Sequence, residues 1–185
     1  MMVPAPGVPG KHFMQVAIMV DDIATACANW TRTTGIGPFL HVPHVFLEEF
    51  DYRGRKSSGL DFSVAIAQSG GVQIELVQQH SDGPSAYRDT IASGEGGFHH
   101  LAIYTDDYSA AYASYIDQGF VAAVDGTFGG YRFSYIDTSK AIGCMVELIE
   151  ANPLQTDFFE RIAAAAEGWD GVTEPIRPGF PAVTE

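Results

Sequence analysis

Two glutamates, a histidine and a glutamine stand out because each lies in a short apolar stretch typical of a β-strand. Glu75 and Glu147 lie in VQIELV and CMVELI, and Gln15 and His100 lie in MQVAIM and HHLAIY. A single glutamate in a strand commonly faces solvent, and a lone histidine or glutamine is equally ambiguous. Together, however, the four side chains offer two carboxylates, an imidazole and an amide oxygen, which are ligands for a divalent metal ion.

An internal repeat connects these four positions. With an offset of 85 residues, residues 13–30 and 98–115 are identical at seven of 18 positions. The repeat places Gln15 opposite His100, and Glu75 and Glu147 both lie in the last predicted strand of their copy. Because a chance match at all four positions is uncommon, we interpret them as two pairs at corresponding places in two related modules.

Each copy is predicted to form a β-α-β-β-β module. After the first strand, an aspartate pair can cap a helix by accepting its free N–H groups. The two helices are expected to end near Gly35 and Gly119. The remaining strands are expected at 44–53, 60–68 and 72–79 in the first copy, and at 120–125, 131–137 and 143–150 in the second.

The predicted fold class is α+β, with two tandem βαβββ modules that form a cupped mixed sheet around a metal site. A C-terminal helix is predicted at 153–167, with Asn152 as its cap, and the tail after Trp169 is expected to be loosely held. The expected organisation is a flexible arm at 1–12, a single domain at 13–150 and a C-terminal helix and tail at 151–185. Within the domain we expect module one at 13–80, a linker with a short helix at 81–97, and module two at 98–150.

Alternation of side chains along a strand predicts which residues share a face with the four polar groups. If the two sheets join into one curved surface, these groups converge. Two carboxylates buried together repel each other, and a divalent metal relieves that repulsion. The predicted metal ligands are Gln15, Glu75, His100 and Glu147, whereas alternation places His99 on the opposite face. The predicted apolar wall of the substrate pocket is Phe13, Ala17, Met19, Val77, Phe98, Ala102, Tyr104, Met145 and Ile149.

Charge and composition exclude several other classes of protein. Ten Lys and Arg residues against 23 Asp and Glu give a net charge of −13, which disfavours nucleic acid and anionic membranes as partners. No apolar run approaches the ~20 residues that span a bilayer. Two cysteines make no disulfide framework. We therefore expect a soluble, cytoplasmic protein.

Module one contains about 13 more residues than module two between its two polar positions. His41 and His44 are expected between the first helix and the second strand, either in a solvent loop or at the rim of a pocket. Arg53, Arg55 and Lys56 form a local positive cluster. It is interpreted as a solvated turn, with binding of an anionic substrate tail as the alternative.

The pattern resembles the vicinal oxygen chelate superfamily, which includes glyoxalase I, methylmalonyl-CoA epimerase, extradiol dioxygenases and bleomycin-resistance proteins. The resemblance covers residues 13 to about 150. It rests on the segments QVAIMVDD, IEL, HHLAI and VEL, which contain the four polar residues. In that superfamily two βαβββ modules form a cup whose metal ligands occupy these positions. The order Gln, Glu, His, Glu is similar to the zinc-type glyoxalase I set.

Other positions depart from individual members of the superfamily. Where glyoxalase I has basic residues that hold glutathione, this chain has Met19 and Gly96. Where the epimerases have an acidic base, it has a position near Ser57. Extradiol dioxygenases use two histidines to hold iron, and Gln15 replaces one of them.

The resemblance implies a metal-dependent isomerase or lyase that moves a proton on the carbon next to a carbonyl of a small substrate. The predicted apolar wall indicates that this substrate is apolar. Glu147 would be the general base and acid, and Glu75 would serve the opposite face or remain a ligand. One divalent metal per chain is expected, with zinc first and nickel, cobalt, manganese or iron as alternatives, in a homodimer. The main alternative is a non-catalytic, antibiotic-sequestering binding protein. An epimerase-like enzyme and an extradiol dioxygenase are less favoured.

Overall fold

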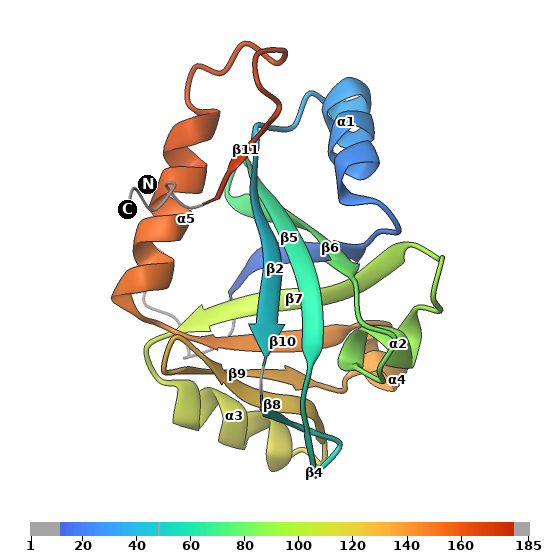
Figure 1. The fold of residues 1–185 in the computed structure, drawn as a ribbon. Helices are drawn as coiled ribbons and strands as arrows, with labels where there is room; N and C mark the ends of the chain where they lie inside the picture. Colours follow the sequence, from blue (N-terminus) through green and yellow to red (C-terminus); the bar gives the residue numbers. More distant parts are fainter. Residues whose placement is uncertain (1–11, 48, 180–185) are drawn as a thin grey trace, which may run out of the picture.

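The computed structural model describes residues 12–47 and 49–179 and places their strands in one mixed sheet. The strand order is β11-β2-β5-β6-β1-β7-β10-β9-β8-β3-β4, and the sheet is strongly curved (Figure 1). The predicted flexible arm lies outside the described residues, apart from His12. The predicted α+β fold class is confirmed.

The two predicted modules form the two halves of this sheet. Module one contains β1 (Phe13–Met19), α1 (Ile23–Thr34), β2 (Phe39–Leu47), β5 (Leu60–Ser69) and β6 (Val72–Gln79). Module two contains β7 (Gly97–Thr105), α3 (Tyr108–Ile116), β8 (Ala122–Phe128), β9 (Tyr131–Ile136) and β10 (Met145–Glu150). The first strand of each module pairs in parallel with its last strand, and the two first strands pair antiparallel with each other. The modules therefore meet along β1 and β7.

Aspartate caps begin both repeated helices, as the sequence predicts. Asp22 accepts a hydrogen bond from the Thr25 N–H at 2.7 Å, and Asp107 accepts one from the Ala110 N–H at 3.0 Å. Gly35, with φ 74°, ends α1, whereas α3 ends at Ile116, ahead of Gly119. Both helices pack on one side of the sheet, each in its own apolar cluster, and the largest core cluster occupies the concave side.

The additional residues of module one form a hairpin that brings the two ends of the sheet together. Its strands are β3 (Phe50–Tyr52) and β4 (Arg55–Ser57), and Asp51 pairs with Asp125 of β8. Arg53 and Gly54 connect them with φ values of 51° and 74°, the combination that a type I′ turn requires. β2 and β8 lie near opposite ends of the strand order. Because β3 follows β2 in the chain but pairs with β8, the two ends of the sheet come together and the concave side is enclosed.

The positive cluster on this hairpin is mostly neutralised, so the structure does not support its use as an anion site. The Arg53 guanidinium lies 2.7 Å from Asp89 Oδ2 and 2.8 Å from Asp137 Oδ2. Lys56 Nζ lies 3.0 Å from Asp51 Oδ2. Arg53 thus fastens the hairpin to α2 (Ala86–Thr90), which carries Asp89, and to the segment that follows β9.

The expected start of the second strand was wrong. β2 begins at Phe39, so His41 and His44 lie within a strand and not in a loop before it. Pro43 lacks an N–H and interrupts the sequence pattern that is typical of a strand. In the structure, a register shift between Val42 and Val45 allows β2 to continue past this proline. The last predicted strand, 143–150, starts later, at Met145, because α4 (Ser139–Ile142) and Gly143 precede it.

The C-terminal segment is held more firmly than expected. The predicted helix is present as α5 (Pro153–Ala166), capped by Asn152, and its Phe158 and Ile162 pack into the concave core. The prediction of a loose tail was wrong for the described residues, because β11 (Ile176–Pro178) pairs in parallel with β2. At the edge of a sheet the backbone N–H and C=O groups of the last strand are unpaired. A segment that contains Pro and Gly can still form hydrogen bonds with these groups, as β11 does with β2.

Tyr104 at the end of β7 anchors the start of α5. Its hydroxyl accepts a hydrogen bond from the Asn152 N–H and donates one to the Asn152 carbonyl, both at 2.8 Å. Its ring contacts Phe159 edge to face. The position of α5 over the concave side (Figure 1) therefore depends on this residue.

Replacing Tyr104 with Phe should lower the free energy of unfolding by about 1–3 kcal/mol, because the buried N–H of Asn152 loses its hydrogen-bond acceptor. Urea unfolding measures this change. The matched control is Tyr115→Phe, since the Tyr115 hydroxyl makes no hydrogen bond among the described residues. Equal stability of the two variants would show that Tyr104 does not anchor α5.

Candidate metal centre

Three of the four predicted ligands converge in the concave side of the sheet. His100 Nε2 on β7 lies 3.3 Å from Glu75 Oε2 on β6 and 3.2 Å from Glu147 Oε2 on β10. His100 is 0% exposed, and the two glutamates are 8% and 9% exposed. In the sheet, β6 and β10 flank the central pair of β1 and β7, so one carboxylate approaches the imidazole from each module.

Small residues between the polar groups allow them to meet. Ala17 on β1 lies between Glu75 and His100 in the register of the sheet. Ala102 on β7 lies between Gln15 and Glu147 in the same way. Since both alanine side chains end at Cβ, the longer neighbours can extend over them.

Gln15 lies beside this group and not within its tightest part. It is 2% exposed and lines the same cavity as the two glutamates. Its Nε2 has no hydrogen-bond partner among the described residues. The two ends of an amide are interchangeable by rotation, so Gln15 can present its oxygen to the centre.

The donor set fits a divalent metal ion. The ligand atoms of Glu75, His100 and Glu147 lie within 4.8 Å of one another. Glu75 Oε2 and His100 Nε2 are buried without a hydrogen bond of good geometry, which is costly unless another group satisfies them. Donors about 2.1 Å from a tetrahedral ion lie about 3.4 Å apart, close to the observed spacing.

His99 also faces the concave side, contrary to the prediction from alternation. Ala17 pairs with His100 and Ile18 pairs with Phe98, so His99 is an extra residue in β7. Such a bulge interrupts alternation and can turn two successive side chains to one side. His99 is 1% exposed, and its Nδ1 lies 2.8 Å from Nδ1 of His100.

The two histidines have pKa values shifted in opposite directions. Burial lowers the pKa of His100, but contacts with Glu147 and Glu75 outweigh it and raise that pKa to about 9. Burial, with a further contribution from His100, lowers the pKa of His99 to about 3. Burial also raises the pKa of Glu75, and the His100 contact opposes this shift. Without a metal, the centre therefore holds a proton on the imidazole between two carboxylates.

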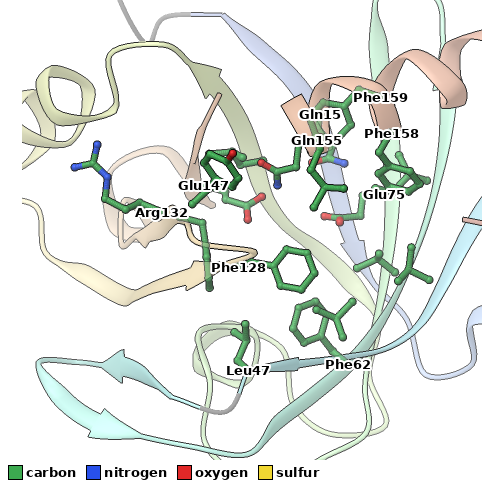
Figure 2. Close-up of a pocket in the computed structure, with 18 of the residues that line it drawn as sticks. Gln15, Leu47, Phe62, Glu75, Phe128, Arg132, Glu147, Gln155, Phe158 and Phe159 are labelled. Carbon is green, nitrogen blue, oxygen red and sulfur yellow. The ribbon is translucent and has the colours of Figure 1, made fainter. Parts of the chain in front are cut away.

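A cavity of about 890 Å³ of empty space, including its open mouth, lies over the two carboxylates. Figure 2 shows Glu75 and Glu147 facing each other across it, with Phe158 and Phe159 of α5 on one side. Most of the wall is apolar and comes from strands opposite the centre and from α5, with contributions from Val42, Leu47, Phe62, Phe128 and Phe133.

Among the nine predicted wall residues, Ile149 lines this cavity. Five others are completely buried beneath it: Ala17, Met19, Val77, Ala102 and Met145. Phe13 and Phe98 are 44% and 46% exposed, and Tyr104 bonds to the start of α5 instead. Alternation along a strand predicts which face of the sheet a side chain is on, but it does not predict how deeply that residue is buried in the curved sheet. Several residues that share a face with the ligands therefore lie in the core and not on the cavity wall.

Sequence reasoning missed the walls contributed by β9 and α5. Tyr131, Phe133 and Tyr135 alternate along β9, and all three line the cavity. Because they occur at every second position, the sequence indicates that they share one face of the strand. The Tyr135 ring lies 5.0 Å from the His100 ring, and its hydroxyl lies 2.9 Å from that of Tyr87. Burial raises the pKa of both tyrosines well above the ordinary value.

The family of the chain follows from its sequence and this fold. A family model for the glyoxalase/bleomycin resistance protein/dioxygenase superfamily matches residues 14–135. The chain belongs to this superfamily. None of the curated proteins matches the sequence.

Solved structures with similar folds include methylmalonyl-CoA epimerase from Mycobacterium tuberculosis. It is 18% identical, with a TM-score of 0.53, and the match covers 85% of this chain and 97% of that chain. A variant of the Streptomyces coelicolor epimerase in complex with 2-nitronate-propionyl-CoA is 20% identical, with a TM-score of 0.52 and coverages of 77% and 98%. A hypothetical protein from Bacillus halodurans is 15% identical, with a TM-score of 0.53 and coverages of 76% and 94%. At these identities the likeness shows the fold.

Among the described residues, none of the helices combines the length and the apolar character that crossing a membrane requires.

The raised pKa of His100 predicts how pH affects the metal-free protein. Between pH 6.5 and about 9, the folded chain keeps a proton that the unfolded chain has lost. Stability from this centre is therefore fully present below pH 6.5 and decreases as pH rises to about 9. The expected loss is on the order of 3 kcal/mol.

Urea unfolding after chelation, repeated from pH 6 to 9.5, measures this loss. The double variant Glu75→Gln/Glu147→Gln is the control, because it removes the contacts that raise the His100 pKa and should have a flatter profile over the same range. A wild-type profile that is as flat as that of the double variant would contradict the assignment.

Proposed function

We propose that the chain is a metal-dependent isomerase or lyase of the glyoxalase type. It moves a proton on the carbon next to a carbonyl group of a small, apolar substrate. The observation that carries this proposal is the position of Glu75 and Glu147. They come from different modules, face one cavity and lie on either side of a buried imidazole.

The metal would be held by Glu75, His100 and Glu147, with the Gln15 amide oxygen as a further donor. Zinc is the first candidate because it accepts nitrogen and carboxylate ligands in small coordination shells. Nickel, cobalt, manganese and iron accept related sets. When bound, such an ion supplies positive charge that polarises the substrate carbonyl and stabilises the negative charge that develops during proton removal.

The two carboxylates are suited to proton transfer on a bound substrate. A substrate in the cavity presents one face toward β10 and the other toward β6. Glu147 would remove and return a proton as general base and acid, and Glu75 would serve the opposite face or remain a ligand. Burial raises the pKa of Glu75, and a carboxylate with a raised pKa is a stronger proton acceptor.

The walls favour an uncharged, apolar substrate that contains a ring. Arg132 is the one cationic side chain among the described residues that line the cavity. Its guanidinium is occupied by Glu150, with contacts of 2.6 Å and 3.1 Å, and it points away from the carboxylates in Figure 2. A glutathione carboxylate or a nucleotide phosphate would enter this wall without a free cation to offset its desolvation.

A non-catalytic binding protein remains a different class of function. An apolar cavity alone would serve such a protein. It would not need two carboxylates and an imidazole with unsatisfied atoms at the base of the cavity, so the metal-dependent enzyme is the better supported proposal.

Removing a ligand should remove the metal. Glu147→Ala and His100→Ala should each lose stoichiometric zinc and remain folded, because each lacks a donor atom. Glu75→Gln keeps an oxygen donor and should bind zinc with lower affinity. Elemental analysis after dialysis measures the zinc content, and Glu95→Ala on an exposed loop is the matched control. Full zinc occupancy in both alanine variants would contradict the site.

Activity is best sought as exchange of a carbon-bound proton in deuterated water. The zinc-loaded protein should exchange the proton next to the carbonyl of aromatic or alicyclic α-hydroxyketones, and NMR follows this loss of signal. Exchange should be absent with Glu147→Gln and normal with Glu95→Gln. The hemithioacetal of methylglyoxal and glutathione is the comparison substrate. Turnover of that compound alone would show that the walls have been misinterpreted.

A further inference from the structure

His99 forms a continuous hydrogen-bonded chain with the candidate ligand His100. Nδ1 of His99 lies 2.8 Å from Nδ1 of His100, and Nε2 of His99 lies 2.9 Å from the carbonyl oxygen of Ala86. Both imidazoles are 0–1% exposed, and no described carboxylate lies within ion-pair distance of His99. His99 is therefore a neutral imidazole with both nitrogens occupied.

The partners determine where each proton lies. The Ala86 carbonyl can only accept, so His99 carries its proton on Nε2 and has a lone pair on Nδ1. The contact between the two Nδ1 atoms then requires His100 to carry a proton on its own Nδ1. A neutral His100 consequently has its lone pair on Nε2, the nitrogen that faces Glu75 and Glu147.

We infer that His99 is a positioning residue that fixes His100 in the tautomer able to bind a metal through Nε2. This inference rests on the metal centre of the proposed function. The opposite neutral tautomer of His100 would bring two lone pairs together at the Nδ1 contact, which is repulsive. Hydrogen bonds from the second nitrogen of a ligating histidine fix ring orientation and increase basicity in the same way.

The carbonyl at the far end of the chain is held in place by the linker between the modules. Ala86 is the first residue of α2, and Ser85 caps this helix by accepting from the Arg88 N–H at 3.1 Å. Ser85 in turn donates to Gln79 Oε1 at 2.6 Å, and Gln79 Nε2 donates to two carbonyls of the linker. The end of β6 and the linker thereby position His99 and, through it, His100.

The local backbone and neighbouring rings restrict His99 further. The extra residue in β7 turns His99 toward the concave side. The rings of Tyr87 and Tyr135 lie 5.1 Å and 5.8 Å from its ring. A side chain enclosed in this manner has one orientation available, so it can serve as a fixed acceptor.

The test compares His99→Phe with His99→Asn. Phenylalanine keeps a ring but removes the acceptor, whereas the Asn side-chain oxygen can occupy the place of Nδ1. Zinc affinity, measured by competition with a chromophoric chelator, should fall about 10- to 100-fold in His99→Phe and recover partly in His99→Asn. His80→Phe is the matched control, since His80 is exposed and does not line the cavity.

A spectroscopic measurement separates positioning from a general loss of structure. In the zinc-loaded protein with ¹⁵N-labelled histidine, His100 should show a protonated Nδ1 and a zinc-bound Nε2. A zinc-bound Nδ1, or wild-type zinc affinity in a folded His99→Phe variant, would overturn the inference. Failure of the wild-type chain to bind zinc would overturn it as well, together with the metal centre. Zinc binding that depends on His99 in a protein inactive on every carbonyl substrate would contradict the proposed function alone.

Discussion

The repulsion between two buried carboxylates is the constraint on which the centre of this protein depends. Glu75 and Glu147 are almost fully removed from water and approach the same nitrogen of His100. Such a pair is stable only if positive charge lies between its members. In the metal-free chain that charge is the proton on His100, whose pKa is raised to about 9. A divalent ion meets the same requirement and also satisfies the atoms left without hydrogen bonds.

The fold brings these charges together through its internal repeat. Antiparallel pairing of β1 with β7 makes β6 and β10 equivalent neighbours, so the last strand of each module contributes one carboxylate. The β3–β4 hairpin and α5 then enclose the space above them with apolar side chains. Apolar walls lower the polarity around the carboxylates, which strengthens each electrostatic interaction within the site. The modules thus supply the reactive groups, and the additional segments supply the environment.

Local patterns in the sequence predicted the parts that depend on local physics. The repeat, the aspartate caps and alternation along the strands predicted two βαβββ modules and grouped Glu75, His100 and Glu147. The bulge at His99 was not predictable, because one extra residue in a strand has no signature in hydrophobic alternation. The pairing of β3 with β8 and of β11 with β2 joins segments far apart in the chain. The edges of β8 and β2 that accept these strands exist only once the whole sheet is assembled, so the local sequence does not predict the pairing.

The most direct test of the metal centre is anomalous X-ray diffraction from crystals of the zinc-loaded protein, recorded on both sides of the zinc absorption edge. The arrangement of the three donor atoms predicts one strong peak per chain, located between Glu75, His100 and Glu147 and next to Nε2 of the histidine. A map without a peak at this position, or with its only peak on surface histidines such as His44 and His80, would contradict the account.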